Sequence, residues 1–260
     1  MKVVIFCGGL GMRLREYSES IPKPMVPIGN RPLVWQLMKY YAHFGHKEFI
    51  LCLGHNAHVI KDYFINYDEC VTNDFVLEGN EAPKLLKTDI ADWKITFADT
   101  GLNANIGERL KAVEKYLGDD EMFFANYADG LSDLPLPNML DFFKASNKTA
   151  CLLCVQPNQT FHYLHLNDNE TAVKSIQDTT DTGLLTNGGY FIFKREIFDY
   201  MRDGEELVHE PFGRLIKNDQ LAAYKYDGFW SCMDTFKDKQ KFDELHVKGE
   251  SPWQVWKEKK

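Results

Sequence analysis

The chain opens with a short apolar run that breaks into a glycine-rich loop, and this junction limits the folds open to it. Residues Val3–Phe6 are apolar and mostly β-branched, which is typical of a strand buried on both faces. Three glycines follow within Gly8–Gly11, where backbone N–H groups can face an anion without a Cβ in the way. Arg13 and Lys23 then supply two cations. Together these features predict a cradle for a triphosphate.

The spacing of this loop differs from two common phosphate-binding loops. It matches neither the dinucleotide pattern G-x-G-x-x-G nor the pattern G-x-x-x-x-G-K-[ST]. Glycines after a first strand are often only turn residues. The added Arg13 and the Lys23-Pro24-Met25 step favour phosphate binding over a plain turn.

Strands and helices alternate through the first part of the chain. Strands are expected over Glu48–Leu53, Trp93–Asp99, Glu121–Asn126 and Thr149–Val155, and helices over Leu33–Phe44, His58–Phe64, Ile106–Leu117 and Pro135–Lys148. This rhythm predicts an α/β fold with a doubly wound, mostly parallel, Rossmann-like sheet flanked by helices. Ligands of such sheets bind at the carboxyl ends of the strands. The glycine loop and Asp129 both fall at such ends.

The second half is less regular and predicts a smaller mixed sheet. Strands are expected over Phe161–Leu166, Thr171–Gln177 and Gly189–Phe193, and helices over Glu196–Met201 and Glu210–Lys217. No linker rich in Pro, Gly or Ser separates the halves. We therefore expect a single domain over residues 1–260, with a nucleotide-binding portion in 1–130. Residues 131–260 would then form an acceptor-binding portion and a C-terminal helical tail.

Composition narrows the class of protein. The 260 residues carry 30 basic and 38 acidic side chains, a net charge of −8, without a dense basic run, which argues against a nucleic-acid partner. No run approaches the roughly 18 apolar residues that span a bilayer, so no membrane partner is expected. Six cysteines without an export signal predict reduced thiols and a cytoplasmic location.

Several motifs, taken in order, resemble those of one enzyme family. They are Gly8-Gly9-Leu10-Gly11-Met12-Arg13-Leu14, Lys23-Pro24-Met25, Gly107-Glu108-Arg109, Tyr127-Ala128-Asp129-Gly130, Asn187-Gly188-Gly189 and Met233-Asp234-Thr235. Over nearly the whole chain they resemble the sugar-nucleotide pyrophosphorylases, a nucleotidyltransferase family, and within it the glucose-1-phosphate cytidylyltransferase branch. The resemblance implies an enzyme of the nucleotidyltransferase fold and favours a homo-oligomer.

The implied reaction needs charge neutralisation more than acid–base catalysis. A phosphate oxygen of the acceptor attacks the α-phosphorus of CTP and pyrophosphate leaves, and this nucleophile is already ionised at neutral pH. The resemblance implies Mg²⁺ held by Asp129 and Asp234, since Mg²⁺ prefers carboxylate and phosphate oxygens. It also implies that Arg13 holds the β- and γ-phosphates and that Lys23 holds the α-phosphate.

The nucleotide side follows the family pattern with one departure. Gly8 and Leu10 are expected to offer backbone contacts to the base, and Gly9 and Gly11 complete the loop. Met12 stands where the family usually has Thr or Ser, so a hydroxyl contact to phosphate is lost. For Arg109 two interpretations remain: it donates to O2 or N3 of cytosine, or it is an ordinary surface arginine of a helix.

The acceptor side departs further from the family. Where the family has a Glu-Lys-Pro step, Ser175–Asp181 contains no lysine, and Thr160–His162 replaces an Arg-Phe-Gly step. His162 and Lys174 are the nearest candidate cations, and the acceptor-binding set is completed by Asn187 and Gly188. A missing charge-assisted hydrogen bond predicts roughly tenfold to hundredfold weaker binding of glucose-1-phosphate.

Three interpretations therefore stay open. The leading acceptor is glucose-1-phosphate or a similar sugar-1-phosphate. A non-sugar phosphate or phosphonate is the alternative acceptor, and a nucleotide-binding homologue without turnover is the third reading. Retention of Arg13, Lys23, Asp129 and Asp234 argues against the last, because a degenerate homologue has no reason to keep all four.

Overall fold

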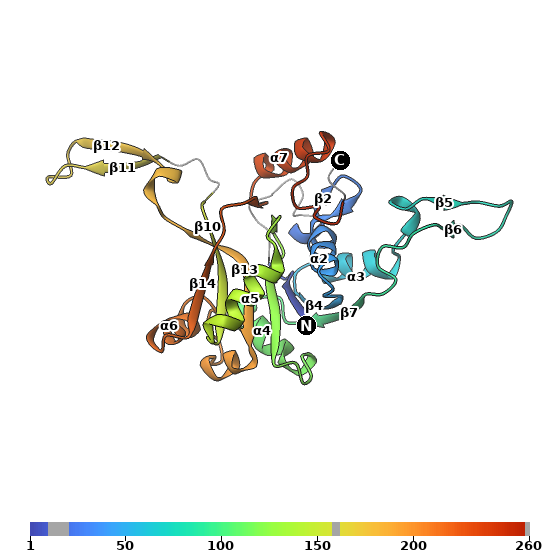
Figure 1. The fold of residues 1–260 in the computed structure, drawn as a ribbon, viewed down its shortest axis with the longest axis horizontal. Helices are drawn as coiled ribbons and strands as arrows, with labels where there is room; N and C mark the ends of the chain where they lie inside the picture. The colour runs from blue at the N-terminus through green and yellow to red at the C-terminus, as the bar shows by residue number, and fades with distance from the viewer. Residues whose placement is uncertain (10–20, 158–161, 258–260) are drawn as a thin grey trace.

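The computed structural model describes residues 1–9, 21–157 and 162–257, and seven strands of these residues form one central sheet. Figure 1 shows how the elements are arranged around it. The predicted nucleotide-loop residues Leu10, Gly11, Met12 and Arg13 lie outside the described residues. The strand order is β14-β10-β13-β8-β1-β4-β7. The strands span, in chain order, β1 Val3–Phe6, β4 Glu48–Leu53, β7 Lys94–Asp99, β8 Met122–Tyr127, β10 Ala150–Val155, β13 Thr186–Lys194 and β14 Leu221–Lys225.

The sheet is parallel except for one strand. β1 pairs in parallel with β4 and β8, β4 with β7, and β10 with β14, whereas β13 runs antiparallel to both of its neighbours, β8 and β10. The amino end of β13 therefore lies at the same edge of the sheet as the carboxyl ends of β1, β4 and β8. This edge is where the sequence predicts the ligand crevice.

The expected mostly parallel, doubly wound sheet flanked by helices is confirmed, and small antiparallel sheets accompany it. Of the strands expected in the smaller mixed sheet, β13 joins the central sheet, because it pairs directly with β8, whereas β11 and β12 pair with each other. In the described parts of the chain, four two-stranded antiparallel ribbons accompany the central sheet. They are β2–β3 (Pro27–Ile28, Arg31–Pro32), β5–β6 (Phe75–Val76, Lys84–Leu85), β9–β15 (Gly130–Ser132, Trp230–Cys232) and β11–β12 (His162–Leu166, Val173–Asp178).

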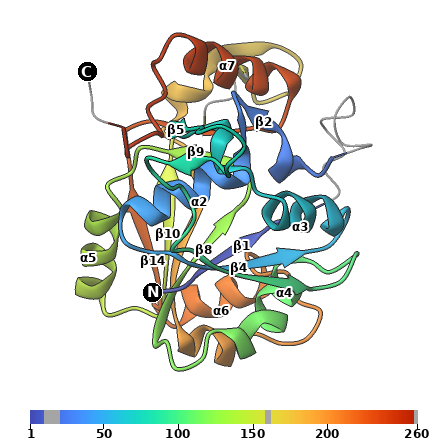
Figure 2. The ribbon, with the colours of Figure 1, turned by 90° about the vertical axis from the view of Figure 1, so that its right-hand side faces the viewer.

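Helices cover both faces of the sheet (Figure 2). Alternate residues of β1 enter two cores: Val3 and Ile5 pack with helices α2, α3 and α5, and Val4 and Phe6 pack with α4, α6 and the 3-10 helix η5. This alternation is the period of two of a strand buried on both faces. The helices span α2 Leu33–His43, α3 Ala57–Ile65, α4 Ile106–Val113, α5 Leu136–Ser146, α6 Glu210–Lys217 and α7 Phe236–Val247, with η5 over Arg195–Tyr200.

Two helix predictions need correction. The helix expected over Ile106–Leu117 is α-helical only to Val113 and ends in the 3-10 helix η3, Glu114–Tyr116. The helix expected over Glu196–Met201 is the 3-10 helix η5. All six cysteines are free, and no described helix is long and apolar enough to cross a membrane.

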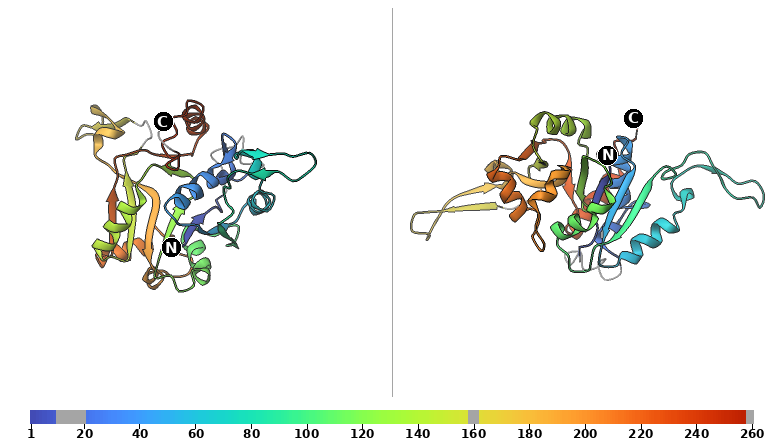
Figure 3. Two further views of the ribbon diagram at one scale, coloured as in Figure 1. Left: turned by 45° about the vertical axis from the view of Figure 1, so that its right-hand side comes forward. Right: turned by 90° about the horizontal axis from the view of Figure 1, so that it is seen from below.

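Two ribbons project from opposite ends of the molecule, and we call them the β5–β6 arm (residues 74–87) and the β11–β12 arm (residues 162–185) (Figures 1 and 3). Every residue of strands β11 and β12 is exposed. Among the described residues, eleven of the nineteen exposed large apolar side chains lie on these arms. The arms thus carry apolar surface that the body of the molecule does not cover.

Candidate active site

Lys23, Asp129 and Asp234 meet at the ligand edge of the sheet. Lys23 begins the 3-10 helix η1 (Lys23–Met25), Asp129 follows β8, and Asp234 follows β15. The Nζ of Lys23 donates to Oδ2 of Asp129 at 2.8 Å and to Oδ1 of Asp234 at 2.6 Å. The three residues predicted to act together are therefore in direct contact, although up to 211 positions separate them in the chain.

Pairing between short strands brings the two aspartates together. β9 and β15 pair antiparallel, with Cys232 opposite Gly130, and the backbone N–H of Met233 donates to the carbonyl of Asp129 at 2.8 Å. Asp234 is held from the other side, because its N–H donates to Asp238 in the first turn of α7. Both carboxylates thus project from anchored backbone.

Lys23, Asp129 and Asp234, which we call the charged triad, stabilise one another's charges. The side chains of Lys23, Asp129 and Asp234 are 16%, 34% and 23% exposed. Burial by itself would lower the pKa of Lys23, but the carboxylates of Asp129 and Asp234 outweigh it and raise that pKa. Lys23 is therefore an ammonium at neutral pH.

The two carboxylates fit a Mg²⁺ site. The Nζ of Lys23 contacts one oxygen of each carboxylate, so both carboxylates face the same cation position. No cluster of three or more metal-binding side chains occurs in the described parts of the chain. Mg²⁺ is usually bound by one or two carboxylates together with substrate phosphates and water.

Two cavities meet at this triad. One cavity, of about 280 Å³, is lined by residues of the β1 end together with Lys23 and Gly9. The other, of about 190 Å³, is lined by Asp234 and by residues from the start of β13. We name them the nucleotide-side and the acceptor-side cavity, after the roles that the sequence predicts for their residues. Tyr127 and Asp129 line both cavities and form their common wall. Two ligands placed in these cavities would meet at Asp129.

Asn187 and Gly188, which the sequence predicts to bind the acceptor, line the acceptor-side cavity. The indole N–H of Trp230, which the sequence did not single out for this site, donates to the carbonyl of Gly188 at 2.8 Å. Gly189 adopts φ +74°, and a Cβ there would lie 2.8 Å from the Tyr127 ring. The glycines of this motif therefore allow the chain to pass closely over Tyr127 and Trp230.

Arg109 is buried beside Gly8. It is 3% exposed and donates to the carbonyls of Gly8, Leu53 and Gly101 at 3.0, 3.2 and 2.9 Å. A Cβ on Gly8 would lie 2.1 Å from its Nη1. Arg109 is thus not an ordinary surface arginine, and any contact with cytosine would come from a guanidinium that already ties together the ends of β1, β4 and β7.

His162 and Lys174 are not part of this site in the structure. Both belong to the exposed β11–β12 arm, and neither lines the two cavities. His162 instead lies 3.2 Å from Asp178 across the arm. Ser175–Asp181, which stands where the family has its acceptor lysine, also begins on this arm. Its place in the sequence therefore does not put it beside the acceptor-side cavity.

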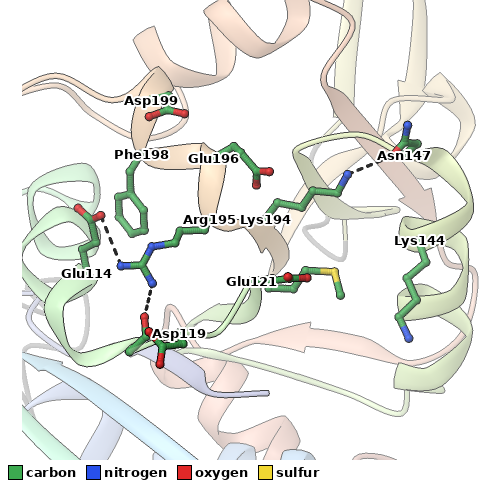
Figure 4. Close-up of a pocket in the computed structure, with 12 residues that line it drawn as sticks. Glu114, Asp119, Glu121, Lys144, Asn147, Lys194, Arg195, Glu196, Phe198 and Asp199 are labelled. Carbon is green, nitrogen blue, oxygen red and sulfur yellow. Dashed lines mark hydrogen bonds and ion pairs between the residues drawn. The ribbon is translucent and has the colours of Figure 1, made fainter.

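A third, larger hollow lies at the other edge of the sheet (Figure 4). It encloses about 920 Å³ and is lined by residues that precede β8 and follow β13. Two of its three cations have partners: Arg195 contacts Glu114, and Lys194 donates to Asn147 at 3.1 Å. It is separate from Asp129 and Asp234, so we assign no catalytic role to it.

Comparison with known proteins identifies relatives along the whole chain. The Nucleotidyl transferase family matches residues 2–238. Glucose-1-phosphate cytidylyltransferase of Salmonella typhimurium is 37% identical over 98% of this chain and 100% of its own length. The probable glucose-1-phosphate cytidylyltransferase of Bacillus subtilis is 33% identical over the same shares.

Solved structures show the same fold at lower identity. A UDP-glucose pyrophosphorylase complexed with UDP-glucose aligns with a TM-score of 0.69 at 17% identity, covering 95% of this chain and 98% of that one. A putative glucose-1-phosphate thymidylyltransferase from Bacillus anthracis aligns with a TM-score of 0.68 at 14% identity, covering 94% of both chains. These likenesses establish the architecture of the central sheet and its helices.

Proposed function

The chain belongs to the nucleotidyl transferase family, and from this premise we propose that it transfers CMP from CTP to a sugar-1-phosphate, with glucose-1-phosphate as the leading acceptor. The observation that carries the proposal is the common wall of the two cavities at Asp129. A nucleotide on one side and a sugar phosphate on the other would bring their phosphates together beside Lys23. The identity to cytidylyltransferases over the full chain supports the choice of base and acceptor.

The described residues would act mainly by positioning and by charge. Lys23 would bind the α-phosphate on the nucleotide side, and Asn187 and Gly188 would orient the sugar on the acceptor side. Mg²⁺, when bound by Asp129 and Asp234, neutralises charge that develops on the phosphates. No general base is needed, because the attacking phosphate oxygen is ionised at neutral pH.

Measurement of pyrophosphate release tests the acceptor. Each nucleoside triphosphate is paired with glucose-1-phosphate, other sugar-1-phosphates, phosphorylated alcohols and phosphonates. Release with CTP and a sugar-1-phosphate is the expected result. Release only with a phosphonate or a phosphorylated alcohol would replace the sugar, and no release with any pair would point to a homologue without turnover.

The choice of base is tested in the same assay. The hydrogen-bonding edges of cytosine and uracil differ, and each unpaired polar group against the wrong base costs about 1–3 kcal/mol. We therefore expect kcat/KM for CTP to exceed that for UTP by about tenfold or more. Equal or better use of UTP or dTTP would contradict a cytidylyltransferase.

We also propose a homo-oligomer. The exposed Leu164, Leu166, Val173 and Ile176 of the β11–β12 arm support it, because a two-stranded ribbon is marginally stable when nothing packs on it. Light scattering after size exclusion should give a mass above that of one chain, and Ile176→Glu should lower it. A monomeric wild-type protein would refute the assembly.

A further inference from the structure

Lys23 occupies the space between the two carboxylates that the proposed function assigns to the metal. Its Nζ lies 2.8 Å from Oδ2 of Asp129 and 2.6 Å from Oδ1 of Asp234. A magnesium ion shared by these carboxylates would lie about 2.0–2.1 Å from its oxygen ligands. The ammonium and the metal therefore cannot both occupy this space.

We infer that Lys23 is a stand-in cation, which keeps Asp129 and Asp234 together in the nucleotide-free protein and keeps a free divalent ion out until phosphate draws the ammonium away. This inference rests on the proposed function for one point, that the two aspartates are the metal ligands. It adds an exchange of cations at one place, with Lys23 as a positioning residue for the carboxylates.

The electrostatics favour a resident cation. Two partly buried carboxylates that face the same point repel each other, and their charges are poorly solvated. One ammonium held by two hydrogen bonds of normal length offsets both costs. The ammonium thus adds to the pairing of β9 with β15 in keeping the two carboxylates side by side without metal.

The position of Lys23 allows its ammonium to contact either the two carboxylates or a bound phosphate. Its neighbours Pro24 and Met25 are buried, which fixes the backbone of η1. Its side chain is a flexible four-carbon stem, so the ammonium can move while the backbone stays. Lys23 also lines the nucleotide-side cavity, so phosphate bound there lies within reach of the same side chain.

The exchange makes metal and nucleotide binding depend on each other. When a phosphate binds the ammonium of Lys23, the two carboxylates lose their neighbouring positive charge. A divalent ion that then binds between them replaces that charge. By linkage, whatever removes Lys23 from the aspartates must strengthen metal binding there. A variant that lacks Lys23 should therefore bind metal in the absence of nucleotide.

Binding of Mn²⁺ alone to the nucleotide-free protein tests this inference, with free Mn²⁺ followed by electron paramagnetic resonance. Lys23→Met removes the charge while keeping the length of the side chain, and it should bind Mn²⁺ about tenfold or more tightly than wild type. Lys23→Arg keeps the charge and should stay within about twofold of wild type. Lys47→Met is the matched control, because it removes a lysine from a surface pair with Asp92, and it should change nothing.

Thermal unfolding provides a second readout. In the presence of a chelator, Lys23→Met should have a lower melting temperature than wild type. Addition of Mn²⁺ should restore most of that difference. Adding Asp129→Asn to Lys23→Met should abolish both the tight binding and the recovery. Lys23→Met that binds Mn²⁺ no more tightly than wild type, or that gains no stability from it, would overturn the inference.

These outcomes are independent of turnover. A wild-type protein that releases no pyrophosphate would refute the proposed function, while the Mn²⁺ titrations would still decide the role of Lys23. An active wild type together with an unchanged Mn²⁺ affinity in Lys23→Met would refute the stand-in cation alone.

Discussion

The nucleotide side and the acceptor side of the sheet edge are held in place differently. On the nucleotide side, charged side chains fix the chain: Arg109 donates to carbonyls at the ends of β1, β4 and β7, and Lys23 donates to two aspartates. On the acceptor side, the lining residues are set by glycine and tryptophan packing around Gly188. The difference indicates that losses on the nucleotide side should be large and general, and those on the acceptor side small and specific.

Asp129→Asn should show the largest effect. The amide keeps the shape but removes a negative charge from the metal site, so we expect turnover to fall by at least about a thousandfold. Pyrophosphate release measures it, and circular dichroism checks that the fold persists. Asp203→Asn, a change at an exposed carboxylate, is the control and should keep full activity. Near-normal release from Asp129→Asn would remove this residue from the metal site.

Arg109→Lys should follow. A lysine cannot hold several carbonyls at once, and each lost charged hydrogen bond costs about 1.5–3 kcal/mol. We expect a lower melting temperature and a KM for CTP raised about tenfold, with the KM for the acceptor nearly unchanged. Arg195→Lys, in the hollow at the opposite edge, should leave both constants as they are. An equal rise in both KM values would break the contrast between the two sides.

Trp230→Phe should have a smaller and one-sided effect. It removes the hydrogen bond to the Gly188 carbonyl, and a neutral hydrogen bond is worth about 1 kcal/mol, or about fivefold. The KM for the sugar-1-phosphate should rise by that factor while the KM for CTP stays constant. Trp93→Phe, which changes a ring packed on Phe49, is the matched control. A rise in the KM for CTP would show that Trp230 serves the nucleotide side.

His162→Ala and Lys174→Met should have the smallest effect. Both side chains belong to the exposed β11–β12 arm, so we expect less than about a twofold change in either KM. Steady-state kinetics with CTP and the acceptor varied in turn will measure this. A clear rise in the acceptor KM would restore the sequence-based expectation, and within an oligomer it would mean that the arm reaches the site of a second copy.

Much of the sheet could be predicted because buried strands leave a strong pattern. Val3–Phe6 and Glu48–Leu53 are largely apolar runs of strand length, and the structure places both inside the sheet, each between two other strands. Lys23, Asp129 and Asp234 could be named from the family motifs, and the structure brings them into contact. Their roles toward metal and phosphate stay predictions.

Contacts between distant parts of the chain could not be predicted. The partners of Arg109 include the carbonyls of Gly8 and Leu53, which come from two other strands, and carbonyls leave no mark on a sequence. The position of the β11–β12 arm could not be predicted for another reason. A strand pattern indicates that two segments pair, but it does not show that the pair projects away from the sheet. Likewise, the sequence does not show that β13 belongs to the central sheet, because it joins that sheet through long-range pairing with β8.

The common wall at Tyr127 and Asp129 has a consequence for the product. A CDP-sugar would fill both cavities as one molecule. Its binding would cost the translational and rotational freedom of one molecule, whereas binding of the two substrates costs that of two. Such a product would bind more tightly than either substrate alone and would compete with both. Consumption of the product by a later enzyme, rather than the supply of substrates, would then set the flux through this one.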